Sequence, residues 1–159
     1  MTKEDITRVA EIHIYAGRVG YREIIPDQIL FKERNVIKAI DKYTKALNDD
    51  KAELFVYDDG LLKGFMTIGK CRDDDKPNSF EIWNIYVEPF MHGKGIGSQL
   101  LEFAKAQAKE KGYNEIALWV FEKNNKARTF YKKNGFEYAG KTKRAKEVDV
   151  AELRYEIKI

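Results

Sequence analysis

The segment 92–97 reads His-Gly-Lys-Gly-Ile-Gly and combines three glycines at alternate positions with a lysine. It lies between a strand-like run over 80–87 and a helix-like run over 98–111. The first turn of a helix carries backbone N–H groups without helical partners, and the helix dipole adds partial positive charge there. Glycines let a pyrophosphate approach this backbone closely, and Lys94 adds a full charge. The segment therefore predicts a phosphate-binding turn.

Two other nucleotide-binding motifs fail on their spacing. A dinucleotide motif that starts at Gly93 needs glycine or alanine where the chain has Ser98, and its acidic residue would be Glu115, at the start of a strand rather than near its end. A Walker-type match over 64–71 has Cys71 where a hydroxyl would hold magnesium, and a charged run follows instead of a helix. We interpret 64–71 as a strand that leads into a loop.

A second motif lies downstream, where residues 124–131 read Asn-Asn-Lys-Ala-Arg-Thr-Phe-Tyr and residues 135–136 read Gly-Phe. Together the two motifs resemble the GCN5-related N-acetyltransferases, the GNAT superfamily. The resemblance is specific over about residues 80–138 and rests elsewhere on the order of the elements. One position departs from the family pattern, because the family's turn usually opens with glutamine or arginine where this chain has His92.

The resemblance implies acetyl-coenzyme A as co-substrate, with its pantetheine arm in the gap between the strand before the turn and the next parallel strand. A bulge near Tyr86 would free strand N–H groups, and the Val87 N–H would donate to the thioester oxygen. The alternative for this segment is an ordinary buried strand. The expected cofactor-binding residues are Ile85, Tyr86, Val87, His92, Gly93, Lys94, Gly95, Ile96, Gly97, Ser98 and Asn124. Asn124 contacts the pantetheine in this interpretation, or else caps the short helix that follows it.

Two side chains are candidates for the catalytic steps. A lysine-like amine costs about 4.6 kcal/mol to deprotonate at pH 7, so a general base would help. Glu81 is the candidate base, because strand alternation puts it on the face of Ile85 and Val87 and its position resembles that of the family's glutamate base. Its alternative is a solvated strand end. Tyr131 matches the family's acid at the departing sulfur, or else packs as a core aromatic.

The acceptor is expected over the first two helices and their connection, where Tyr21, Arg22 and Phe31 offer aromatic walls and one charge. A small-molecule amine, a peptide N-terminus and a lysine side chain all remain open. The predicted function is direct transfer of an acetyl group to a primary amine. A non-catalytic acyl-CoA-binding regulatory or sensor domain is the alternative, and a homodimer remains open.

Composition limits the other classes of function. The 159 residues, of which 43% are hydrophobic, predict one globular domain over 1–159. The net charge of +3 is too small for a nucleic-acid-binding domain. A single cysteine and two histidines exclude an internal disulfide and argue against a metal site. No run resembles a signal peptide or a membrane span, so we expect a cytoplasmic protein without a membrane partner.

Hydrophobic spacing predicts the elements that must position these residues. A first helix should begin after Asp5 and end at Gly17 to Gly20, and a second helix, or a pair, should be capped at Asp27 and run to about Leu47. Two further helices are expected over 98–111 and 124–133, and six strands over 53–57, 61–70, 80–88, 115–122, 136–143 and 150–159. The predicted fold class is α/β: a GNAT-like mixed, mostly antiparallel sheet with a parallel central strand pair and helices on both faces.

Overall fold

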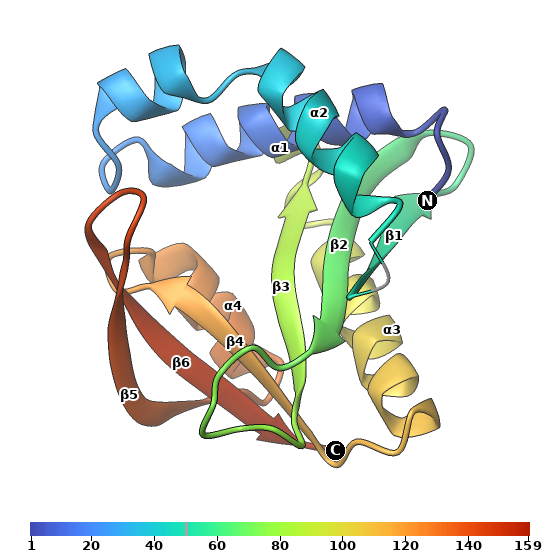
Figure 1. The fold of residues 1–159 in the computed structure, drawn as a ribbon, viewed down its shortest axis with the longest axis vertical. Helices are drawn as coiled ribbons and strands as arrows, with labels where there is room; N and C mark the ends of the chain where they lie inside the picture. Colours follow the sequence, from blue (N-terminus) through green and yellow to red (C-terminus); the bar gives the residue numbers. More distant parts are fainter. Residues whose placement is uncertain (50) are drawn as a thin grey trace.

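The structure is a computed structural model that describes residues 1–49 and 51–159 (Figure 1). The helices are α1 (Ile6–Tyr21), the π-helix η1 (Gln28–Glu33), α2 (Val36–Ala46), the short 3₁₀-helix η2 (Pro89–Met91), α3 (Ile96–Glu110) and α4 (Asn125–Lys133). The strands are β1 (Ala52–Asp58), β2 (Leu62–Lys70), β3 (Phe80–Val87), β4 (Glu115–Phe121), β5 (Glu137–Ala145) and β6 (Val150–Lys158). All six predicted strands are therefore present, with ends shifted by a residue or two.

The strands form a single sheet in the order β1-β2-β3-β4-β6-β5. β3 and β4 are parallel, and the other neighbouring strands are antiparallel. The parallel pair is the strand–helix–strand unit that the glycine-rich turn predicted, since α3 provides the crossover between its strands. The predicted mixed sheet with a parallel central pair is confirmed.

Helices cover both faces of the sheet, as the sequence predicted (Figure 1). On one face α1 and α2 bury an apolar cluster that includes Val9, Tyr43 and Phe65. On the other face α3 buries a larger cluster, in which Leu101 packs with Met66 and other residues of the sheet. Apolar residues of the central strands therefore pack into one of two separate layers, one on each face of the sheet.

The first two helices differ in detail from the predicted ones. α1 continues through Gly17 to Tyr21, and Gly17 is buried in its packed face. The apolar side chains that this helix buries, such as Ile12 and Ile14, outweigh a helix cost of about 1 kcal/mol for glycine.

η1 and α2 are the pair of helices that the sequence allowed, and Asp27 is the N-cap residue of η1, although its side chain makes no capping hydrogen bond. α2 is capped by Asn35, whose Oδ1 accepts from the Lys38 N–H at 3.0 Å.

None of the helices in the described part of the chain has both the length and the apolarity needed to cross a membrane.

Candidate active site

The parallel strands β3 and β4 separate soon after they begin to pair. Their pairing extends only from Phe80–Ile116 to Ile82–Leu118. On its other side β3 stays paired with β2 as far as Val87, so the separation comes from β4 turning away. A gap therefore opens in the middle of the sheet, as the resemblance implied.

A β-bulge coincides with the start of this gap. Ile82 pairs with Ile68 and Asn84 pairs with Thr67, so Trp83 is the extra residue of the bulge, without a partner on β2. The predicted position of the bulge, near Tyr86, is wrong by three residues. The bulge also changes which residues share a face of the strand.

Beyond the bulge, the faces of β3 are the reverse of those that simple alternation predicts. Ile85 and Val87 pack with the α3 layer, as Ile82 does. Tyr86 packs with the α1–α2 layer and faces the same way as Glu81, because the extra residue shifts the alternation by one. The prediction that Glu81 shares a face with Ile85 and Val87 is therefore wrong.

Two backbone N–H groups of β3 point into the gap. The Glu88 N–H donates to the Lys63 carbonyl oxygen on β2 at 2.8 Å. Successive N–H groups of a strand point to opposite sides, so those of Ile85 and Val87 point away from β2, where β4 no longer runs. These donors are available to a ligand in the gap.

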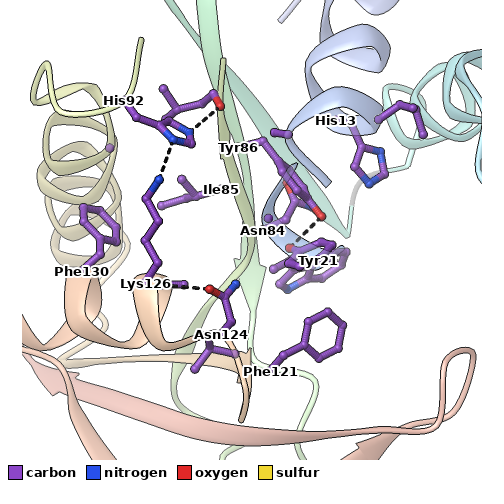
Figure 2. A pocket seen from close by; sticks show the side chains of 18 of the residues that line it. His13, Tyr21, Asn84, Ile85, Tyr86, His92, Phe121, Asn124, Lys126 and Phe130 are labelled. Atoms are coloured by element: carbon purple, nitrogen blue, oxygen red, sulfur yellow. Dashed lines mark hydrogen bonds between the residues drawn. The ribbon is translucent and has the colours of Figure 1, made fainter. Parts of the chain in front are cut away.

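A cavity of about 830 Å³ fills the gap and continues between α1, α2 and the sheet (Figure 2). Its walls include most of the residues singled out in the sequence: Tyr21, Ile85, Tyr86, Val87, His92, Gly93, Gly95, Ile96, Gly97, Ser98, Asn124 and Tyr131. Glu81, Lys94, Arg22 and Phe31 are not among the lining residues. The structure thus brings the two motifs together around one cavity.

The glycine-rich turn forms one end of this cavity. Gly93 and Gly95 have φ values of 79° and 80°, a left-handed backbone that favours glycine. Gly97 serves packing instead, since a Cβ there would lie 3.0 Å from the Phe130 ring. Gly95 is the N-cap of α3 and has no side chain to cap it, so the first N–H groups of the helix lack a side-chain acceptor, and residues 95–98 line the cavity.

Both ring nitrogens of His92 make polar contacts that connect the glycine-rich turn to β3 and α4 (Figure 2). Its Nε2 lies 3.1 Å from the Val87 carbonyl oxygen, and its Nδ1 lies 3.1 Å from the Nζ of Lys126. The Lys126 ammonium can only donate, so Nδ1 accepts and Nε2 donates to Val87. Lys126 lines the cavity, whereas the Lys94 ammonium lies 3.4 Å from the Met91 sulfur. Sequence reasoning missed Lys126, although it stands within the second motif.

Asn124 has the capping role that was one of its two alternatives. Its Oδ1 accepts from the Ala127 N–H at 3.1 Å at the start of α4. The side chain also lines the cavity.

Three tyrosines meet where the gap joins the wider part of the cavity. The Tyr21 hydroxyl donates to the Tyr86 hydroxyl at 3.4 Å (Figure 2). Burial raises the pKa of Tyr21, Tyr86 and Tyr131, and the field of Tyr86 raises the pKa of Tyr131 further. All three are therefore protonated at neutral pH and can act as hydrogen-bond donors.

Glu81 is held away from the cavity by an arginine. Its side chain is only 2% exposed and pairs with the Nη2 of Arg72 at 2.5 Å. It also accepts from Arg72 Nε at 3.0 Å and from the Arg72 backbone N–H at 2.9 Å. The guanidinium stacks on Trp83, 4.3 Å from the ring centroid. The Glu81 carboxylate thus accepts hydrogen bonds from three N–H donors of Arg72.

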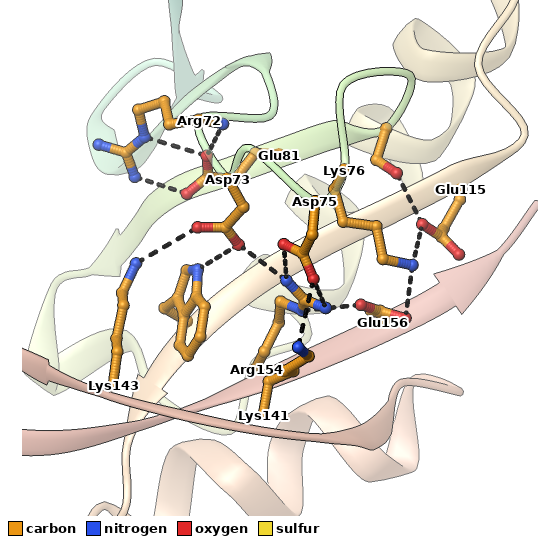
Figure 3. A network of polar contacts seen from close by, with 12 residues as sticks. Arg72, Asp73, Asp75, Lys76, Glu81, Glu115, Lys141, Lys143, Arg154 and Glu156 are labelled. Atoms are coloured by element: carbon orange, nitrogen blue, oxygen red, sulfur yellow. Dashed lines mark hydrogen bonds and ion pairs between the residues drawn. The ribbon is translucent and has the colours of Figure 1, made fainter.

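A polar network anchors the loop that carries Arg72 (Figure 3). The buried Arg154 binds both carboxylate oxygens of Asp75, at 2.7 and 2.9 Å, and Asp73 accepts from the indole N–H of Trp119 at 2.9 Å. The hydrogen bond from Arg154 lowers the pKa of Asp75 to about 2. The loop over 72–79 is therefore fixed to β4 and β6, and Arg72 is fixed against Glu81.

We predict that Glu81→Gln lowers stability more than it lowers turnover. The amide keeps the shape of the side chain but loses charge-assisted hydrogen bonds to Arg72, each worth about 1.5–3 kcal/mol when partly buried. Denaturant unfolding measures this loss, and Glu137→Gln, an exposed strand residue, is the control that should change little. Unchanged stability with strongly reduced turnover would return Glu81 to the role of base.

The acceptor end of the cavity differs from its predicted form. Leu30 is the buried residue of η1, so Phe31 points outward, is 49% exposed and lies under the guanidinium of Arg18. Arg22 is exposed at the end of α1. Of the three predicted acceptor-side residues, Tyr21 lines the cavity, whereas Arg22 and Phe31 do not.

Other residues supply this end of the cavity, and they come from distant parts of the chain. The aromatic ones are Trp83, Trp119 and Phe121, and the charged ones are Glu33, Arg34, Lys38, Lys42, Glu147 and Glu152. No local motif joins these positions, so no signal in the sequence could have gathered them.

The comparisons with known proteins agree with this geometry. The model of the acetyltransferase (GNAT) family matches residues 21–136. An uncharacterized N-acetyltransferase encoded in the region 3' of pepI in Lactobacillus delbrueckii subsp. lactis is 30% identical over an alignment of 149 residues, which covers 85% of this chain and 85% of that relative. An uncharacterized N-acetyltransferase of Methanocaldococcus jannaschii is 30% identical over 86% of this chain, which spans 58% of that relative's length.

Solved structures share the whole fold. The PaiA N-acetyltransferase from Thermoplasma acidophilum, in complex with coenzyme A, has a TM-score of 0.77 at 21% identity and covers 100% of this chain and 96% of its own. An N-acetyltransferase from Staphylococcus aureus Mu50 has a TM-score of 0.72 at 25% identity, with 99% and 94% covered.

Proposed function

Because the chain belongs to the GNAT family of acetyl-CoA-dependent N-acetyltransferases, we propose that it moves an acetyl group from acetyl-CoA to a primary amine by direct attack. One observation carries the proposal: a single cavity joins the uncapped start of α3, the gap between β3 and β4, and a wider chamber under α1 and α2. Such a cavity offers one end to an extended anionic cofactor and the other to an acceptor.

The residues around the gap suit acetyl-CoA. The diphosphate would lie on the N–H groups of residues 93–98, with Lys126 close by. The pantetheine would run along β3, where Ile85 and Val87 present free N–H groups, and would pass Asn124. One of these two strand N–H groups, Val87 in the sequence-based prediction, would donate to the thioester oxygen as negative charge develops on it.

The transfer itself needs few groups. The nitrogen lone pair of the free amine forms the new bond to the thioester carbon, and the carbon–sulfur bond then breaks. Tyr131 remains our proposed donor to the departing sulfur, since its raised pKa keeps its proton in place at neutral pH. Its hydroxyl either stabilises the thiolate by a hydrogen bond or gives up the proton.

Binding of acetyl-CoA is expected to raise the melting temperature, whereas nicotinamide cofactors and ATP are expected to leave it unchanged. A ligand at about 100 times its Kd stabilises a protein by about 2.7 kcal/mol. A thermal shift series measures this effect. Equal shifts with ATP would contradict a site built for coenzyme A.

An acceptor screen separates the enzyme from the sensor alternative. Small-molecule amines, peptide N-termini and lysine peptides are each mixed with acetyl-CoA, and the release of free thiol is recorded. The proposal expects release that depends on at least one amine. If the protein binds acetyl-CoA but releases no free thiol with any amine of the three groups, the result would favour a regulatory domain.

A further inference from the structure

Three carboxylates line the acceptor end of the cavity, and one of them differs from the others. The side chain of Glu147 is 90% exposed and lies 4.0 Å from Arg34. Glu33 is exposed and accepts a hydrogen bond from Gln28 at 3.4 Å. Glu152 is half-buried, and within residues 1–49 and 51–159 it has neither a hydrogen-bond donor nor an ion-pair partner. It is the carboxylate available to a ligand.

The sheet places Glu152 on the wall that faces the chamber. It pairs in register with Phe121 on β4 and with Lys143 on β5. Side chains of directly paired antiparallel residues lie on the same face, so Glu152 stands beside Phe121, three residues beyond the last β3–β4 pair. It therefore lies where β4 has already left β3 and the cavity is open.

The surroundings of Glu152 favour a group that can take up a proton. Burial raises its pKa, as do the negative charges of Glu81 on β3 and Asp73 on the neighbouring loop. Lys143 on β5 and Arg72 on the loop act in the opposite direction. Both cations have other partners, since Arg72 binds Glu81 and Lys143 lies 3.7 Å from Asp73.

The other titratable groups of the chamber suit this task less well. Burial, with Lys42 and Arg34 nearby, lowers the pKa of His13 to about 3, so its imidazole holds a proton only weakly. The tyrosines are protonated and cannot accept a proton at neutral pH. Glu81 is bound to Arg72 outside the cavity.

We propose that Glu152 is the general base, a role that rests on the acetyl transfer proposed above. The acceptor enters as an ammonium ion, and one of its protons moves from nitrogen to a carboxylate oxygen of Glu152. The lone pair left on nitrogen forms the bond to the thioester carbon, the carbon–sulfur bond breaks, and the departing sulfur takes a proton from Tyr131 or from water. The nitrogen is cationic once the new bond has formed and loses a second proton, which replaces the one that Tyr131 or water gave to the sulfur. Glu152 then returns its proton to water, so the step releases one proton overall.

Two probes of nearly equal shape test this role. 2-Phenylethylamine is charged at neutral pH, whereas O-benzylhydroxylamine, with an oxygen in place of one methylene, is uncharged and needs no base. For Glu152→Gln at pH 7 we expect kcat/KM to fall about 100-fold with 2-phenylethylamine. With O-benzylhydroxylamine we expect a change of a few-fold at most. The loss with 2-phenylethylamine should diminish as pH rises, since each pH unit gives about ten times more free amine.

The controls separate folding, cofactor binding and chemistry. Glu122→Gln changes an exposed carboxylate next to Phe121 that does not line the cavity, and it should behave as wild type. Titration calorimetry should give Glu152→Gln the wild-type affinity for acetyl-CoA. If Glu152→Gln folds poorly, Glu152→Ala offers a second test. Added formate should restore its turnover of 2-phenylethylamine, because this small acid can take the place of the missing carboxylate.

Three outcomes would overturn the inference: wild-type activity of Glu152→Gln with both probes, an equal loss with both probes, or a wild-type enzyme that acetylates neither probe. The proposed function fails separately, through absent acetyl-CoA binding or absent thiol release in the whole acceptor screen.

Discussion

Replacing Gly95 by valine is expected to weaken acetyl-CoA binding by about 100-fold or more, while the protein stays folded. Gly95 is the N-cap of α3 at a φ of 80°, and a β-branched residue there is both strained and bulky. The new side chain would stand where we propose that the diphosphate approaches the backbone. Titration calorimetry of acetyl-CoA against both proteins measures the loss directly.

Gly112→Val is the matched control for this prediction. Gly112 has a φ of 81° at the other end of α3, where a Cβ would meet nothing within 4 Å, and it does not line the cavity. The two variants therefore share backbone strain but differ in their distance from the phosphate end. Equal acetyl-CoA affinity for Gly95→Val and Gly112→Val would remove the turn from the cofactor site.

The second large effect is expected at Tyr131. Tyr131→Phe should lower kcat by about 100-fold, the order found when one transition-state hydrogen-bond donor is lost. The affinity for acetyl-CoA should stay within a few-fold of wild type, because the donor acts on the departing sulfur. Raising the pH should restore little activity, since alkali increases the free amine but does not replace a hydrogen bond to sulfur.

Tyr138→Phe tests whether any lost tyrosine hydroxyl has this effect. The Tyr138 hydroxyl lies 3.2 Å from Thr142 Oγ1 on exposed β5, away from the cavity lining. Its loss should leave kcat unchanged. Tyr131→Phe with wild-type kcat would make Tyr131 a packing residue beside Phe130 and Phe136, whose rings lie 5.3 and 5.9 Å from its own.

Much of the fold could be predicted because its signals are local. Asp58 and Gly60 mark the turn between β1 and β2, and the glycine-rich turn joins a strand to a helix at one place in the chain. Apolar spacing then gives the remaining elements. The parallel pair of β3 and β4 follows from the strand–helix–strand order alone.

The faces of β3 could not be predicted, because one extra residue decides them. Trp83 shifts the alternation, so Ile85 and Val87 face away from the side of Glu81, whose carboxylate pairs with Arg72. Nothing in the spacing of residues 80–87 marks which residue bulges out. The separation from β4 begins at the same place, so the bulge belongs to the geometry that opens the gap.

The residues that line the acceptor chamber could not be predicted from the sequence, for a different reason. Trp83, Lys42 and Glu152 lie on β3, α2 and β6, and only the folded sheet and helices bring them to one cavity. A lone glutamate on a strand looks like an ordinary surface residue in the sequence. Glu152 becomes a candidate only because it is half-buried in the cavity wall beside the gap. That position depends on the separation of β3 and β4.

The central claim is that acetyl-CoA enters the gap between β3 and β4 with its phosphates at the start of α3. A crystal structure of the complex with acetyl-CoA tests it most directly. We expect diphosphate oxygens within hydrogen-bond distance of the N–H groups of residues 93–98, and the thioester oxygen on the N–H of Val87 or Ile85. A cofactor bound outside this gap, with the uncapped turn of α3 left free, would contradict the claim.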